Sequence, residues 1–72
     1  MVSREVFPKD VIRALKKLGF FVIHQKGSHV RLGHKNGQRA TIAVHPKPLA
    51  IGTLASILRQ AGIIRKELDN AL

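Results

Sequence analysis

The residues best suited to chemistry lie in the segment Lys26–Arg31, which reads Lys-Gly-Ser-His-Val-Arg. Its residue at position 29 is a histidine, the residue type whose unperturbed pKa of about 6.5 suits it to act as an acid or a base near neutral pH. The Gly-Ser pair before it forms a turn that can bring a backbone close to a phosphate. Cations at both ends of the segment attract a polyanion. The segment therefore predicts acid–base chemistry at a phosphate ester.

The candidate phosphate contacts surround this histidine. They are the side chains of Lys26, Arg31 and Arg39, the backbone N–H groups and the hydroxyl of Gly27 and Ser28, and Lys47 together with the positive end of the following helix. Each cation could equally be a plain solvated charge. Four further cations, Lys9, Arg13, Lys16 and Lys17, fall on the polar side of a predicted helix, and we expect these to be solvated.

The other three histidines are weaker candidates. His45 could approach the site if the register of the sheet allows it, or it could bond a loop carbonyl before Pro46. We expect His24 and His34 to be solvated strand residues. The spacings between the four histidines are 5, 5 and 11, and the chain has no cysteine. This pattern argues against a zinc site, and we predict no metal and no cofactor.

The charge balance narrows the class of partner. The chain has 13 Lys and Arg against 4 Asp and Glu, for a net charge of +9. No acid occurs between Asp10 and Glu67. Such an excess favours a nucleic-acid partner. The alternatives are a surface tuned for solubility, or a contact for an acidic protein.

The length and the hydropathy of the chain indicate how many domains it has and whether it spans a membrane. Seventy-two residues predict one domain over residues 1–72. The longest unbroken apolar run, residues 20–23, is far shorter than the roughly 20 residues of a membrane span. The N-terminus lacks the apolar block of a signal peptide. We therefore expect a soluble, cytoplasmic protein that does not use a membrane as partner.

Helical periodicity marks the first element. Apolar residues at 11, 12, 15 and 18 form one stripe of a helix over residues 8–18. Pro8 suits the first helical position, and Gly19 suits the position after the last one. The sequence thus predicts an amphipathic helix that packs on one side.

Three strand-like segments follow. Residues 20–26 are aromatic and β-branched, whereas residues 29–34 and 39–45 alternate, with Val30, Leu32, Ile42 and Val44 facing inward. Asn36-Gly37 is a strong hairpin signal. A second helix follows, capped by Gly52 or Thr53, with its apolar stripe at 54, 57, 58 and 61 and its end at Gly62. Residues 63–72 predict a short terminal helix.

The predicted order is α-β-β-β-α with a short C-terminal helix, an α+β fold like that of double-stranded-RNA-binding domains. Three antiparallel strands would carry both helices on one face. The other face would be free, and it would display His29 and Arg31 with Thr41 across from them. Fold order alone is weak evidence about chemistry.

Four segments together carry a more specific resemblance. They are Gly19-Phe20, Gln25 to His29, Thr41 to His45, and Gly52 to Gly62. In order and spacing the chain resembles the HicA family of toxins, also called YcfA-like proteins, from Val11 to about Leu68. Many members have a second histidine directly after the first, where this chain has Val30.

The resemblance implies a small endoribonuclease, the toxin of a type II toxin–antitoxin pair, which cleaves mRNA without a metal. It implies His29 as the catalytic residue and a HicB-like antitoxin as the partner that covers the active surface. Cleavage of RNA needs a base, a cation and an acid. One histidine cannot serve best as both base and acid in one step, so a second group or a water is required.

Two other function classes stay open at this point. The chain could be a non-catalytic RNA-binding module of the same fold, which holds duplex RNA by shape and phosphates. It could also be an interaction domain whose basic face docks an acidic protein. A helix-turn-helix DNA-binding domain fits poorly, because three strands separate the two helices.

Overall fold

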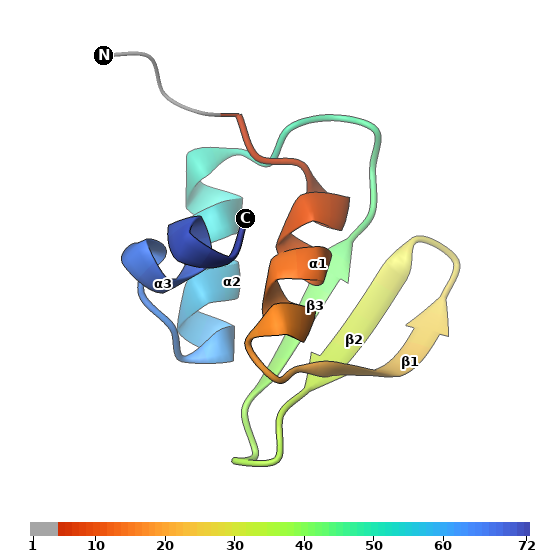
Figure 1. Cartoon of the computed structure of the whole chain (residues 1–72). Helices are drawn as coiled ribbons and strands as arrows, with labels where there is room; N and C mark the ends of the chain where they lie inside the picture. The colour runs from red at the N-terminus through yellow and green to blue at the C-terminus, as the bar shows by residue number, and fades with distance from the viewer. Residues whose placement is uncertain (1–4) are drawn as a thin grey trace.

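The computed structural model describes residues 5–72 and shows three helices and a three-stranded antiparallel sheet among them (Figure 1). The elements are α1 (Pro8–Lys17), β1 (Phe21–Lys26), β2 (His29–Gly33), β3 (Arg39–Ala43), α2 (Ile51–Ala61) and α3 (Arg65–Ala71). The predicted α+β class and element order are confirmed, including the terminal helix. Strand order in the sheet is β1-β2-β3.

Helix α1 starts and ends where its sequence predicts. Pro8 is its first residue, Asp10 lies in its first turn and Lys16 and Lys17 in its last, which suits the helix dipole. Gly19 follows with a φ of 100°, a left-handed conformation that glycine adopts without strain. The chain therefore leaves α1 sharply and enters β1.

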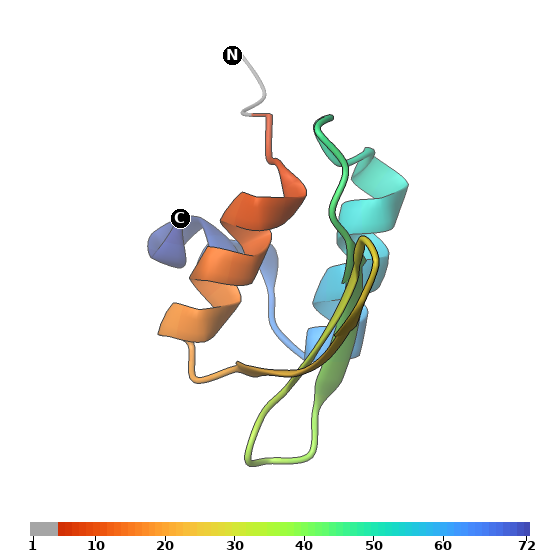
Figure 2. The same ribbon diagram turned by 90° about the vertical axis from the view of Figure 1, so that its right-hand side faces the viewer.

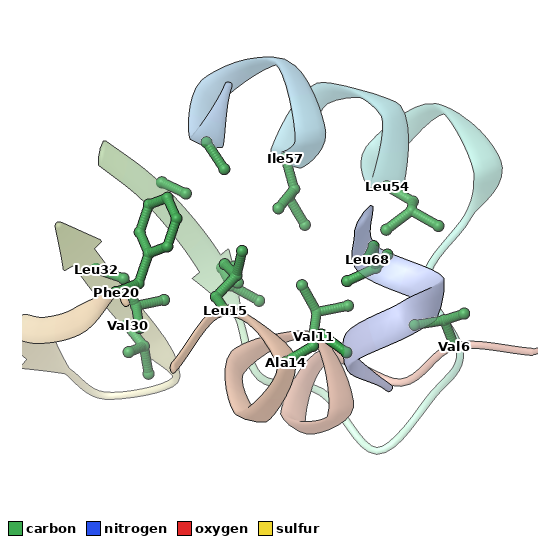
Figure 3. Packing of buried hydrophobic residues seen from close by; sticks show 14 residues of the cluster. Val6, Val11, Ala14, Leu15, Phe20, Val30, Leu32, Leu54, Ile57 and Leu68 are labelled. Atoms are coloured by element: carbon green, nitrogen blue, oxygen red, sulfur yellow. The ribbon is translucent and has the colours of Figure 1, made fainter. Parts of the chain in front are cut away.

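One continuous core lies between the helices and one face of the sheet (Figure 3). The strands supply Val30, Leu32, Ala40 and Ile42, the helices supply Val11, Ala14, Leu15, Leu54, Ile57, Ala61, Leu68 and Ala71, and Val6 and Phe20 fill the ends. The predicted inward side of β2 and β3 is therefore confirmed.

Helices α1 and α2 both contribute to this core, but they sit differently on the sheet. In Figure 2, α1 lies on one face of the sheet, whereas α2 lies beyond β3 and continues the layer that the strands form. The Oε1 atom of Gln60 on α2 accepts a hydrogen bond of 3.0 Å from the backbone N–H of Thr41. Helix α2 thus covers the β3 edge of the sheet, and no helix within residues 5–72 covers the face opposite α1.

The start of α2 differs from the prediction. The helix begins at Ile51 with Ala50 as its N-cap, and no side chain caps it. Neither Gly52 nor Thr53 is the cap, since both lie inside the helix. The end at Gly62 is confirmed, where φ is 72° and the backbone N–H donates to the carbonyls of both Leu58 and Arg59.

The two hairpins of the sheet are built differently. Gly27, with a φ of 58°, and Ser28 form a two-residue turn between β1 and β2. The β2–β3 connection is longer, because Gly37 (φ 95°) donates to the carbonyl of His34 at 2.8 Å around a turn through Lys35 and Asn36. The Asn-Gly signal therefore marks a hairpin, in which the glycine takes the left-handed position after the turn.

No helix in the described part of the chain is long and apolar enough to cross a membrane.

Candidate functional site

The uncovered face of the sheet, which we call the open face, carries most of the residues predicted to do chemistry. In an antiparallel sheet, residues directly opposite each other point to the same side. His29 lies opposite Lys26 on one side and Ala43 on the other. Arg31 lies opposite His24 and Thr41, in the next row.

The third row of the open face contains Phe21, Gly33 and Arg39. All three predicted phosphate-binding cations of the strands, Lys26, Arg31 and Arg39, therefore lie on one surface with His29. Each of these side chains is exposed. Thr41 lies across from Arg31, as the sequence predicted.

The turn before His29 is held in place by the third strand. The backbone N–H of Val44 donates to the Ser28 carbonyl at 2.6 Å. A Cβ built on Gly27 would meet nothing within 4 Å, so glycine is needed there for its positive φ and not for space. The turn is thus fixed at one end of the open face, and its backbone is open to a ligand.

No acid lies on the open face in the described part of the chain. Asp10 pairs with Arg13 at 3.8 Å on α1, and Asp69 pairs with Arg65 at 2.8 Å on α3. The Glu67 carboxylate accepts the Ile64 N–H at 2.9 Å at the start of α3. Within residues 5–72, the three cations of the open face form no ion pair. Their charge is therefore available to a polyanion.

Lys47 lies apart from the other predicted phosphate contacts. It is exposed in the loop between β3 and α2, four residues before the helix begins. The first turn of α2 carries no acid, so nothing in that turn offsets the positive end of its dipole. Lys47 therefore lies outside the rows of the open face, beyond the opposite end of β3 from Arg39.

A groove of about 530 Å³ opens beside this loop. It is lined by Phe7, Lys9, Val44, His45 and Pro46. His45 lies two residues past the end of β3, and within residues 5–72 its ring forms no hydrogen bond. The predicted bond from His45 to a loop carbonyl is therefore not formed. Lys9 is exposed, as predicted, and it also lines this groove.

The remaining two histidines have different surroundings from each other. His34 is half-buried beyond the end of β2, with its ring centroid 5.0 Å from that of Phe20, and its Nδ1 accepts the N–H of Asn36 at 3.1 Å. The prediction of a solvated strand residue is wrong for His34, because its ring packs on the core and orders a turn. His24 is exposed on β1, as predicted, but it shares the open face with His29.

The register could have placed His24 from the sequence. A two-residue turn at Gly27-Ser28 pairs Lys26 with His29, and alternation then brings residue 24 to the same side. Within residues 5–72, no three residues of the metal-ligating types gather closely enough to hold a metal ion.

The fold and the open face define a class, that of small α+β domains with a basic, uncovered sheet face. The comparison with known families is more specific. The model of a family described as the HicA toxin of bacterial toxin–antitoxin systems matches residues 8–63. The chain therefore belongs to the HicA toxin family, and its role is that of a toxin with an antitoxin partner. No curated protein matches the sequence significantly.

Proposed function

We propose that this toxin is an endoribonuclease that cleaves mRNA in the cytoplasm, with His29 as a catalytic acid or base. One observation carries the proposal. His29 is exposed at the end of a face that holds Lys26, Arg31 and Arg39 and no acid within residues 5–72. A toxin that only bound RNA would need the cations but not a histidine among them.

The surrounding groups fit the requirements of phosphodiester cleavage. Lys26 lies directly opposite His29, and Arg31 lies two residues along the same strand, so either cation can neutralise charge that develops on the phosphate oxygens. The Gly27-Ser28 turn offers backbone N–H groups and a hydroxyl next to them. Arg39 and Lys47 would bind phosphates further along the chain of the RNA.

Val30 supports the assignment of a single histidine in this segment. It lies opposite Ile42, is 4% exposed, and points into the core. The position next to His29 therefore cannot contribute a side chain to the open face. Any second acid–base group must come from another strand or from water.

The partner that neutralises this toxin is proposed to be a HicB-like antitoxin with an acidic contact surface. Such a protein would cover the open face, because the charge there is uniformly positive within residues 5–72. On the edge strand β1, Phe21 of the open face and Ile23, whose side chain lies over Gly33, are also exposed, by 53% and 42%. An interface over this region would combine apolar burial with charge pairing.

The test is induction of the wild-type chain and of His29→Ala in growing bacteria, with total RNA followed on a gel. We expect the wild type to halt growth and degrade mRNA and the variant to do neither. His29 is exposed, so its replacement should leave the thermal unfolding of the purified protein unchanged. Purified wild type that binds RNA without cutting it would instead make the chain a non-catalytic RNA-binding module.

A further inference from the structure

A second histidine, His24, lies beside His29 on the open face. The turn at Gly27-Ser28 pairs Lys26 with His29 and His24 with Arg31. Residues paired in this way project to the same side of a sheet. Both imidazoles are exposed, and they belong to neighbouring strands.

The spacing of the two histidines suits one phosphate between them. His24 is the diagonal neighbour of His29, and such neighbours in an antiparallel pair lie roughly 7–8 Å apart. Two imidazoles that start at this distance can each reach one of two oxygens on opposite sides of the same phosphorus. A proton donor or acceptor needs to come within about 3 Å of its target oxygen.

The charged groups around the pair are all positive. Lys26 faces His29 from β1, and Arg31 faces His24 from β2. The residues of β3 in these rows, Thr41 and Ala43, are uncharged. A phosphate placed between the histidines is therefore flanked by two cations, and within residues 5–72 no carboxylate competes for it.

A bulge in β1 allows His24 to lie on the open face while the residue before the strand packs in the core. The register shifts between Val22 and His24, so that Ile23 is the extra residue. Without the shift, alternation would put Phe20 on the same side as His24, whereas Phe20 is 5% exposed and packs in the core. The bulge lets Phe20, directly before β1, pack in the core while His24 lies on the open face.

Gly33 provides the space for the bulge. A Cβ on Gly33 would collide with Cδ1 of Ile23, so the bulged side chain lies where residue 33 has none. Bulges commonly re-aim side chains next to active sites. Here the residue that directly follows the bulge is His24.

We propose that His24 is the second catalytic acid–base group of the RNA cleavage, and that it works as a pair with His29; this inference rests on the proposed function. One neutral imidazole takes the proton of the ribose 2′-hydroxyl as O2′ forms a bond to phosphorus. The bond from phosphorus to O5′ breaks, and O5′ receives a proton from the other, protonated imidazole. The products are a 2′,3′-cyclic phosphate and a 5′-hydroxyl.

The experiment compares purified wild type, His24→Ala and His29→Ala on a single-stranded RNA and on the same RNA with sulfur in place of the bridging O5′. A thiolate leaves without protonation, so only the variant that lacks the acid should regain activity on the sulfur substrate. Gln25→Ala is the matched control, because Gln25 is exposed on the same strand and is paired with the buried Val30.

We expect His24→Ala to lose roughly 10²- to 10⁴-fold in kcat on the ordinary RNA, as acid–base residues do, and Gln25→Ala to cleave normally. One of the two histidine variants should recover on the sulfur substrate and the other should not. The bell-shaped pH profile of the wild type should lose one limb in His24→Ala.

Two results would overturn the inference while the proposed function stands. One is cleavage by His24→Ala within about threefold of wild type. The other is slow cleavage of the ordinary RNA by His24→Ala when neither histidine variant recovers activity on the sulfur substrate. His24 would then contribute to RNA binding and not to proton transfer. A wild type that cuts neither substrate overturns both the inference and the proposed function.

Discussion

Neutralising the cations of the open face should weaken RNA binding and reduce its dependence on salt. The perturbation is the triple variant Lys26→Gln, Arg31→Gln and Arg39→Gln, made together with His29→Ala so that the RNA is not cut. The three cations lie in successive rows of one surface, and within residues 5–72 they form no ion pair. All three can therefore contact phosphates of the same RNA strand.

The magnitude follows from counterion release. Each phosphate contact with a single strand contributes a slope of about 0.7 to the plot of log K against log salt concentration. Loss of three contacts should therefore reduce the slope by about 2. At a salt concentration of about 0.15 M each contact is worth roughly fourfold in affinity, so the triple variant should bind about 50-fold more weakly.

The assay is fluorescence anisotropy of a labelled single-stranded RNA over a series of salt concentrations. The matched control replaces Arg13, Lys16 and Lys17 by Gln in the same background. These side chains are exposed on α1, which packs against the opposite face of the sheet, and their replacement changes the net charge equally. A control variant that loses as much slope as the open-face variant would refute the reasoning, because binding would then follow total charge.

Three further predictions concern substitutions of single residues. Gly52→Ala should stabilise the fold by about 0.5–1 kcal/mol in denaturant unfolding, because Gly52 lies inside α2 and a Cβ there meets nothing within 4 Å. Gly62→Ala should destabilise it by about 1–2 kcal/mol or more, since φ is 72° and the Cβ would collide with the Gln38 amide; equal midpoints for these two glycine variants would contradict this. His34→Ala should cost about 1 kcal/mol through loss of the Phe20 contact and leave RNA cleavage unchanged, and a large drop in kcat without loss of stability would place His34 in the catalytic machinery instead.

The elements with strong periodic signals could be predicted from the sequence. The stripe of α1, the glycines after α1 and α2, and the inward positions of β2 and β3 all lie where apolar spacing and backbone preference require. These features depend on local chemistry and on one buried face, which a sequence displays directly. The predicted row of Arg31 and Thr41 follows from the same alternation.

The start of α2 could not be predicted, because tertiary contacts decide it. Two residues with suitable cap chemistry, Gly52 and Thr53, lie inside the helix. The segment before the helix is held instead by the Leu49 N–H, which donates to the Val6 carbonyl at 2.7 Å. A bond between residues so far apart in sequence leaves no local signal.

The bulge of β1 escaped prediction for a related reason. Residues 20–23 are all aromatic or β-branched. Their pattern therefore does not reveal where the alternation between core-facing and open-face side chains is shifted by one residue. The phase depends on Phe20 entering the core beside α1 and on Gly33 leaving room for Ile23 on the neighbouring strand. Only the pairing of β1 with β2 brings these conditions together.

The valine at position 30 shows how strictly the sheet separates packing from chemistry. Many family members have a histidine here, next to the one that corresponds to His29. In this fold the side chain at 30 lies among apolar core residues at 4% exposure, while its neighbour is exposed on the opposite side. A polar ring buried there would need a hydrogen-bond partner that the surrounding apolar side chains do not offer. Valine therefore favours stability at a position where a histidine could not reach a phosphate on the open face. The second proton-transfer group that we propose, His24, lies on the neighbouring strand instead.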